Sequence, residues 1–419
     1  MKRILYMLLL VALPLAGSAQ FVYSASSHIR SPRMELNGEW NALPVMTLGS
    51  DDVIYFSFDE MSHTYRRFTY RITHCNQDWT PSDMHEIEFL EGFNNVPVEE
   101  WENSVNTTRL YTHYQFTLPN ENVSLLLSGN YKVELFDDEE EDDDAIPVAV
   151  FCFSVVEPKV GITASVSGDT DVSLNEGHQQ LSFIVDYSNW SIASPSSEVK
   201  PVIYQNRRRD NAVCGIKPTY ITGNTLEYVH NEKLIFNAGN EYRRFELTDP
   251  DYPGMNVEEI ALHGDEYHAL LYMDKERVTH SSYIDEDGRF YVNTLEGYGS
   301  PIEADYVYVH FALDAPFREG GDYYLLGELG GNAFTPMTLL DYDAEEGYYH
   351  TTQLLKLGLY NYMYAWLPHG AETAQTAAAE GDFYDTENEY LIYIYYRGFS
   401  DRYDRLLGVH RINYSLERN

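Results

Sequence analysis

The polar stretch from His74 to Asp83 offers the most obvious chemistry, with the order His-Cys-Asn-Gln-Asp-Trp-Thr-Pro-Ser-Asp. A cysteine beside a histidine suggests a thiol nucleophile, because an imidazole can lower the pKa of a thiol. Neighbouring residues of a β-strand point to opposite faces, however, so His74 and Cys75 could not readily share a proton on a strand. We predict no catalytic cysteine here.

Carboxylate pairs are the second possible source of chemistry. Hydrolysis of a glycosidic bond requires two carboxyl groups that face one cleft, and Glu387 with Glu389 or Asp401 with Asp404 could supply them. The chain has 66 acidic residues, so such pairs also arise by chance. We interpret all four as surface residues that flank strands and turns.

Metal and cofactor motifs are absent from the sequence. It has no Cys-x-x-Cys or His-x-x-x-His pair, no P-loop, no dinucleotide fingerprint and no Gly-x-Ser-x-Gly elbow. We therefore predict no catalytic residue, no metal site and no cofactor. The acidic run Asp137 to Asp144 lacks the spaced aspartates and the glycine of a calcium loop. Because eight like charges repel one another and resist burial, we interpret the run as a mobile hairpin loop, with an ion site as the alternative.

The charge balance excludes one class of partner. The formal net charge is −38, and phosphate groups would repel such a protein, so we predict that it binds no nucleic acid. The one visible basic cluster is Arg207-Arg208-Arg209, which we interpret as the solvated end of a strand.

Three cysteines, an odd number, exclude a dense disulfide framework. Cys75 and Cys152 could pair if their strands are neighbours, and buried free thiols are the alternative.

The first twenty residues predict export. Lys2 and Arg3 precede an apolar run from Ile4 to Leu15, and small residues end at Ala19, so we expect a signal peptide (1–19) that is cleaved after Ala19. No cysteine follows to carry a lipid anchor. No later segment has the roughly 18 uncharged apolar residues of a membrane-spanning helix, so we expect an untethered protein without an integral membrane segment.

Alternation of apolar and polar residues predicts strands throughout the chain. Clear examples are 54–58, 68–72, 114–118, 131–135, 149–155, 181–187, 307–313 and 390–396. A chain of 419 residues is too long for one hydrophobic core. We predict an all-β protein of tandem β-sandwich domains, immunoglobulin-like or early-set-like, with boundaries at 20–157, 158–300 and 301–419.

Several short motifs of polar and aromatic residues resemble those of one known family. They are 74–83, Glu91-Gly92-Phe93-Asn94, 104–108, 111–114, 118–120 and 128–131, with 385–390 and 402–408 near the C-terminus. In this order they resemble the type IX secretion system plug proteins of Bacteroidetes. The likeness brackets nearly all of the chain after the signal peptide.

The resemblance implies a non-enzymatic periplasmic protein at the inner face of the outer membrane. Such a protein would bind the type IX translocon barrel and close its periplasmic opening. Because the family-like motifs are densest from Asn76 to Asn95, we choose partner-binding candidates there, namely Asp78, Trp79, Ser82, Asp83, Phe93 and Asn94.

A second resemblance concerns the residues from Tyr323 to Tyr364, which look like the early-set sandwiches found beside starch enzymes. In those domains a tryptophan usually follows the asparagine that corresponds to Asn332, whereas Ala333 and Phe334 stand here. The resemblance thus supports the sandwich more than it supports sugar binding. With 36 tyrosines able to stack on sugars, a periplasmic glycan-binding protein is the alternative function, and a hydrolase is a third.

Overall fold

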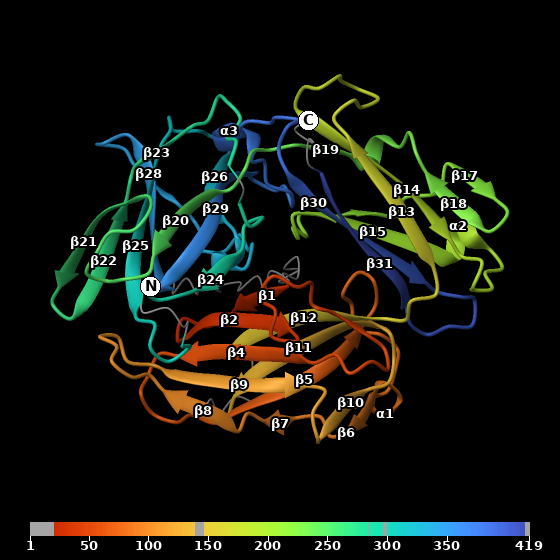
Figure 1. Ribbon diagram of the computed structural model, residues 1–419, viewed down its shortest axis with the longest axis horizontal. Helices are drawn as coiled ribbons and strands as arrows, with labels where there is room; N and C mark the ends of the chain where they lie inside the picture. Colours follow the sequence, from red (N-terminus) through yellow and green to blue (C-terminus); the bar gives the residue numbers. More distant parts are fainter. Residues whose placement is uncertain (1–20, 139–145, 284, 296–299, 415–419) are drawn as a thin grey trace, which may run out of the picture.

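β-Strands dominate the protein and confirm the predicted all-β fold of tandem sandwiches (Figure 1). The predicted alternation is visible in the first sandwich, where Ile54, Phe56 and Phe58 are fully buried and Tyr55 is 49% exposed. The computed structural model describes residues 21–138, 146–283, 285–295 and 300–414.

The first domain packs two sheets around an aromatic core. In that core the ring of Phe56 stacks on Phe116 at 4.8 Å and meets Phe151 edge-on at 5.4 Å. The larger sheet consists of β1 (Val22–Ser24), β12 (Ala149–Val156), β11 (Gly129–Asp137), β5 (Phe68–Cys75) and β7 (Val96–Pro97), with β3 (Val45–Thr47) parallel to β12. The facing sheet consists of β2 (Ile29–Leu36), β4 (Ile54–Glu60), β9 (Thr112–Leu118) and β8 (Glu100–Asn103). One end carries α1 (Glu86–Phe89) and the pair β6 (Leu90–Gly92) and β10 (Val123–Leu125).

The second domain is completed by the last strands of the chain. Its first sheet consists of β13 (Gly161–Ser167), β14 (His178–Asp186), β18 (Thr225–Tyr228), β17 (Tyr220–Thr222) and β19 (Ile235–Asn237). Its second sheet consists of β16 (Val213–Cys214), β15 (Val199–Gln205), β30 (Asn388–Tyr396) and β31 (Arg405–Tyr414). Two short helices, α2 (Pro195–Glu198) and η1 (Glu232–Leu234), join its strands.

The third domain lies between these two parts of the second domain in sequence. One of its sheets consists of β20 (Arg243–Leu247), β29 (Gly358–Pro368), β24 (Phe290–Val292) and β26 (Gly321–Leu326). The other consists of β21 (Val257–His263), β22 (Glu266–Leu271), β25 (Tyr306–Asp314), β28 (Tyr348–Lys356) and β27 (Asp341–Asp343), with β23 (Asp274–Lys275) beside β25. The short helices η2 (Glu328–Gly330) and α3 (Ala377–Glu380) complete it.

This strand pairing suggests a division of the chain that differs from the boundaries expected at residues 158–300 and 301–419. β30 pairs with β15 and β31 pairs with β30, whereas neither pairs with a described strand of residues 243–380. Alternation identifies a strand but not its distant partner, so the sequence pattern could not reveal this pairing. We propose that residues 243–380 form a third domain inserted into the second.

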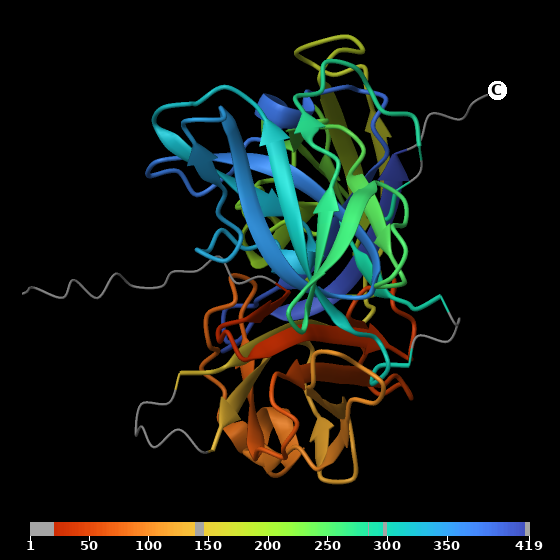
Figure 2. The same ribbon diagram turned by 90° about the vertical axis from the view of Figure 1, so that its left-hand side faces the viewer.

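The three domains meet at one junction. The first domain lies below the other two, which stand side by side above it (Figures 1 and 2). The carbonyl oxygen of Asn41, in the first domain, accepts a hydrogen bond of 3.0 Å from Arg207 in the second domain and one of 2.9 Å from Arg289 in the third. A single peptide group therefore bonds to both other domains.

The arginine triplet Arg207-Arg208-Arg209 is buried at this junction, so the prediction of a solvated strand end was wrong. Each guanidinium points to a different surface, and together they fasten the second domain to the other two. Arg208 binds Asp210 and the carbonyl oxygen of Ala374 in the third domain, at 3.0 Å. The Arg209 guanidinium lies 3.7 Å from the ring centroid of Trp79 in the first domain.

Two of the four predicted surface carboxylates are also buried. The fully buried carboxylate of Glu389 lies 3.1 Å from Nε of Arg207 and 2.5 Å from Nε of Arg411. Asp404 is 2% exposed and lies 2.7 Å from Nζ of Lys200. Buried charge requires a partner, and both carboxylates are buried against cationic side chains, so neither group lines a hydrolytic cleft.

Replacement of Glu389 by alanine should destabilise the protein strongly, because the buried Arg207 guanidinium would lose the carboxylate that pairs with its Nε atom. We expect a loss of about 3–5 kcal/mol in the free energy of unfolding, measured by urea denaturation. The matched control is Glu387→Ala two residues earlier, where we expect a loss of about 1 kcal/mol or less. Equal losses in the two variants would contradict this role for Glu389.

Candidate interface

The segment from Asn76 to Asn95, where the family-like motifs are densest, folds as a turn and a short helix at one end of the first domain. β5 ends at Cys75, and the backbone then turns, with the N–H of Trp79 donating to the carbonyl of Asn76 at 2.9 Å. Helix α1 follows, and its start is fixed by the backbone N–H of His85, which donates to the Glu88 carboxylate at 2.8 Å. This end of the domain lies at the lower right in Figure 1.

Trp79 is not available to a partner, which corrects its choice as a binding residue. Its side chain is 7% exposed and lies against the second domain, and its backbone φ is 64°. There the ring packs under Arg209 and near Phe21, at 6.3 Å between ring centroids. Trp79 therefore holds two domains together through a cation–π contact.

Ser82 and Asn94 are half-buried and shape the loop. The Ser82 hydroxyl lies 2.7 Å from Nδ1 of His74. The Asn94 side chain pairs with both backbone groups of Ile72, accepting at 2.8 Å and donating at 2.9 Å. The side-chain amide thus forms the two hydrogen bonds that a neighbouring strand would form with Ile72 at the edge of β5. Both residues position the neighbouring surface side chains.

The remaining candidates lie on the surface. Asp78 and Asp83 are exposed, and Phe93 is 75% exposed. Ile87 on α1, which the sequence analysis did not select, is 84% exposed. We name Asp78, Asp83, Ile87 and Phe93 the tip surface. An isolated apolar residue between Glu86 and Glu88 was the sequence signal for Ile87.

A hairpin of the second domain is attached beside the tip surface. Arg402, in the turn between β30 and β31, donates to the carbonyl oxygen of Asp83 at 3.2 Å and pairs with the Glu88 carboxylate. Phe399, in the same turn, is fully exposed to solvent. Since the turn is far from the tip in sequence, no local pattern could have associated the two.

His74 and Cys75 point to opposite faces of β5, as predicted. His74 packs against Tyr131 in the core, at 5.0 Å between ring centroids, and burial lowers its pKa to about 4. Burial raises the pKa of the Cys75 thiol to about 12. Cys75, Cys152 and Cys214 are free, and β11 separates the strands of Cys75 and Cys152. An inert, protonated thiol is the result.

The acidic run begins inside the protein, contrary to the prediction that these charges resist burial. Asp137 is 4% exposed and lies 2.6 Å from Nη2 of Arg66, while Asp138 lies 2.9 Å from Nε of Arg67. The remainder of the run, 139–144, lies outside the described residues. Within the described part of the chain, no group of three or more histidine, cysteine, aspartate or glutamate side chains is arranged to hold a metal ion.

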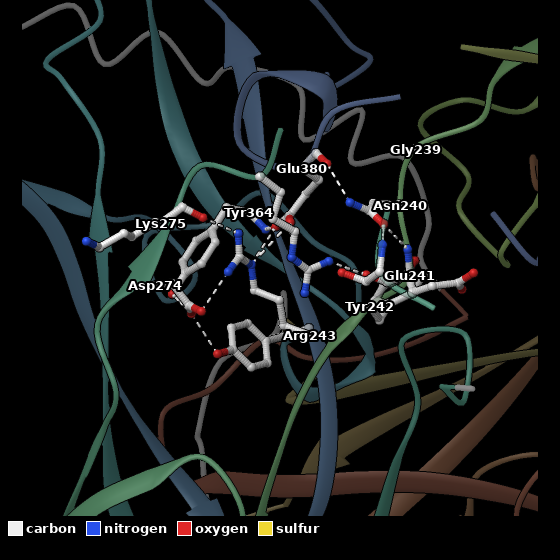
Figure 3. Close-up of polar contacts among 12 residues, drawn as sticks. Gly239, Asn240, Glu241, Tyr242, Arg243, Asp274, Lys275, Tyr364 and Glu380 are labelled. Carbon is white, nitrogen blue, oxygen red and sulfur yellow. Dashed lines mark hydrogen bonds and ion pairs between the residues drawn. The ribbon is translucent and has the colours of Figure 1, made fainter. Parts of the chain in front are cut away.

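A buried polar network joins the second and third domains where the chain passes between them twice (Figure 3). Nε of Arg243 donates to the Glu380 carboxylate at 3.0 Å, and Nη1 donates to Asp274 at 2.6 Å. The Asn240 side chain donates to the carbonyl oxygen of Glu380 at 2.8 Å. Because Glu380 is fully buried and paired with cations, the network stabilises the joint and offers no reactive group.

Carboxyl groups crowd one side of this joint. Burial, together with the charges of Asp285 and Glu387, raises the pKa of Glu241 to about 8. Burial and the charge of Asp287 raise the pKa of Asp285 to about 7. The folded protein thus retains protons that the unfolded chain would release near pH 4.

The joint should therefore weaken as pH rises. A carboxyl group whose pKa is higher in the folded than in the unfolded protein stabilises the fold fully below its unfolded pKa. This contribution decreases as the pH rises from the unfolded pKa to the folded pKa, here from about pH 4.5 to 8. Glu241→Gln keeps the group neutral, so from pH 5 to pH 8 the variant should gain about 1–3 kcal/mol in unfolding free energy relative to the unmodified protein. Urea denaturation at both pH values tests this, with exposed Glu259→Gln as the control. A difference that is independent of pH would contradict it.

Comparison with known proteins agrees with this architecture. Residues 29–157 match the domain described as "Type 9 secretion system plug protein 1st domain". A crystal structure of a protein from Parabacteroides merdae ATCC 43184, described as hypothetical, superimposes with a TM-score of 0.91. The two sequences are 39% identical, and the match covers 94% of this chain and 99% of that chain. A comparison with curated proteins found no match.

The matched domain is the one that carries the tip surface. It belongs to a secretion-system family and not to a known enzyme family, which supports a role related to type IX secretion. Among the described residues, no helix is both long and apolar enough to cross a membrane. The chain belongs to the type IX secretion system plug protein family, with the family's first domain at residues 29–157.

Proposed function

We propose that this protein binds the outer-membrane type IX translocon barrel from the periplasm and closes its opening when no substrate occupies the pore. The observation that carries the proposal is the family match of the first domain, together with the exposed apolar side chains on the tip surface of that same domain. An export signal cleaved after Ala19 would deliver the protein to the inner face of the outer membrane.

Closing a pore requires a rigid body and a complementary surface, and no catalytic group. The buried polar contacts at the three-domain junction supply rigidity, because Arg207 and Arg208 are each held by partners from more than one element. A plug built this way would resist deformation while it covers an opening.

The tip surface has the composition of a protein-binding site. Phe93 and Ile87 supply exposed apolar side chains, and Asp78 and Asp83 supply exposed carboxylates. We propose that this surface, together with Phe399, contacts a rim with apolar pockets and basic side chains. Complementary charge would orient the approach, while the apolar side chains would supply most of the affinity.

The main argument for the glycan-binding alternative was the abundance of tyrosine, and the burial of many tyrosines weakens it. Many of the tyrosines are core residues, among them Tyr70, Tyr114, Tyr131, Tyr323 and Tyr390, each at most 1% exposed. Buried rings pack against other rings and cannot stack on a sugar.

Charge placed on the tip surface should release the barrel. We expect Phe93→Asp and Ile87→Asp each to lower the amount of translocon barrel that copurifies from detergent-solubilised outer membranes by about tenfold, since each would put a charge into an apolar contact. Both side chains are exposed, so thermal stability should not change.

Leu262→Asp is the matched control. Leu262 is 56% exposed on β21 in the third domain, and this variant should retain the barrel. The proposed contact surface would be refuted if all three variants retain the barrel equally, and the plugging function would be refuted if the unmodified protein never copurifies with it.

A further inference from the structure

A cleft opens beside the three-domain junction. It contains about 750 Å³ of space between atoms, a volume that includes open solvent. Trp40 of the first domain and Phe290 of the third domain form apolar walls, and Arg207 of the second domain also lines it. Junctions between domains are a common location for ligand sites.

One polar group in the cleft is buried and unsatisfied. Asn332 is 7% exposed and lines the cleft, and its Oδ1 has no hydrogen-bond partner among the described residues. A buried acceptor without a donor is costly, so this oxygen requires a donor that a ligand or a water molecule would supply.

Glu328 places a second acceptor in the cleft. Its side chain is 35% exposed, and its nearest ion-pair contact, to Nη1 of Arg207, is 3.7 Å long. This distance is too long for a hydrogen bond, so the carboxylate has acceptor capacity to spare. Arg207 meanwhile uses its Nε and Nη2 atoms on Glu389 and Asn41. Burial raises the pKa of Glu328, as expected for a carboxylate with few donors.

Hydrogen-bond donors also line the cleft. Within the described part of the chain, Nη1 of Arg207 contacts Glu328 at 3.7 Å and makes no hydrogen bond. Arg33 pairs with Glu35 through Nη2 at 2.5 Å, and its guanidinium carbon lies 5.7 Å from the ring centroid of Phe290. A guanidinium has five N–H donors, so both arginines can bind a further anion.

These groups select a ligand class by exclusion. A simple cation would be repelled by Arg33 and Arg207, and a simple anion would be repelled by Glu328. A ligand with a positive charge, a negative charge and an apolar part could interact with the carboxylate, the arginines and the apolar walls of the cleft.

We propose that this cleft binds an apolar amino acid or short peptide in its zwitterionic form. The ammonium group donates to Glu328 and to Oδ1 of Asn332. The carboxylate accepts from Arg33 and Arg207, and the apolar side chain packs between Trp40 and Phe290. Since these residues come from all three domains, the bound ligand stabilises their arrangement. The proposal is independent of binding to the translocon barrel.

Isothermal titration calorimetry on the chain from residue 20 onwards tests the proposal. L-Leucine, L-phenylalanine and the dipeptide Leu-Phe should bind at concentrations up to about 10 mM, a range suited to a small ligand of millimolar affinity. N-acetyl-L-leucine lacks the ammonium group and L-leucinamide lacks the carboxylate, so each should bind at least about tenfold more weakly than L-leucine if each charge is held by a desolvated partner.

Two variants identify the site. Glu328→Gln removes the acceptor charge with little change in shape, and Asn332→Gly removes the amide while tolerating the backbone φ of 53°. Each should weaken L-leucine at least about tenfold, whereas exposed Glu121→Gln should bind unchanged. Thermal unfolding checks that all variants are folded. The proposal is overturned if no probe binds, or if both variants bind L-leucine like the unmodified protein.

Discussion

Burial of three consecutive arginines controls how the domains are arranged. Arg207, Arg208 and Arg209 follow β15 after one intervening residue, and each requires a partner because a buried guanidinium is costly when unpaired. The partners lie on the first domain, on the third domain and on β30. The domains cannot reorient without exposing or unpairing these charges. Both the plug proposal and the ligand cleft depend on this rigidity, since each needs surfaces from different domains to stay in register.

Much of the fold could be predicted from local sequence patterns. The alternation in Ile54 to Phe58 and in Phe68 to Ile72 predicted strands that β4 and β5 contain, and it also placed His74 and Cys75 on opposite faces. The pairing between strands that are distant in sequence could not be predicted. The same alternation in 390–396 correctly predicted β30, but nothing in it indicated that β15, some two hundred residues earlier, is its partner.

Charged residues were the other source of error. Arg207, Glu389 and Asp404 were interpreted as solvated because isolated charged groups avoid the interior, and each is buried against a partner that is distant in sequence. Trp79 was chosen for a partner surface and instead packs under Arg209. The tip surface was therefore only partly predicted. Phe93 was chosen from the family-like motifs, while Phe399 lies in a hairpin turn that Arg402 attaches to the first domain.

The insertion of the third domain determines the order in which the protein can fold. Whether it leaves a ribosome or an export channel, the chain emerges from its N-terminus, so the strands of the first domain are all available by Val156. The second sandwich, by contrast, has β15 without its neighbour β30 until more than 180 further residues have been made. During that interval one edge of β15 has no neighbouring strand, and an unpaired strand edge favours misassociation. A nascent chain of this protein would therefore benefit from a chaperone that covers β15 until the last strands emerge.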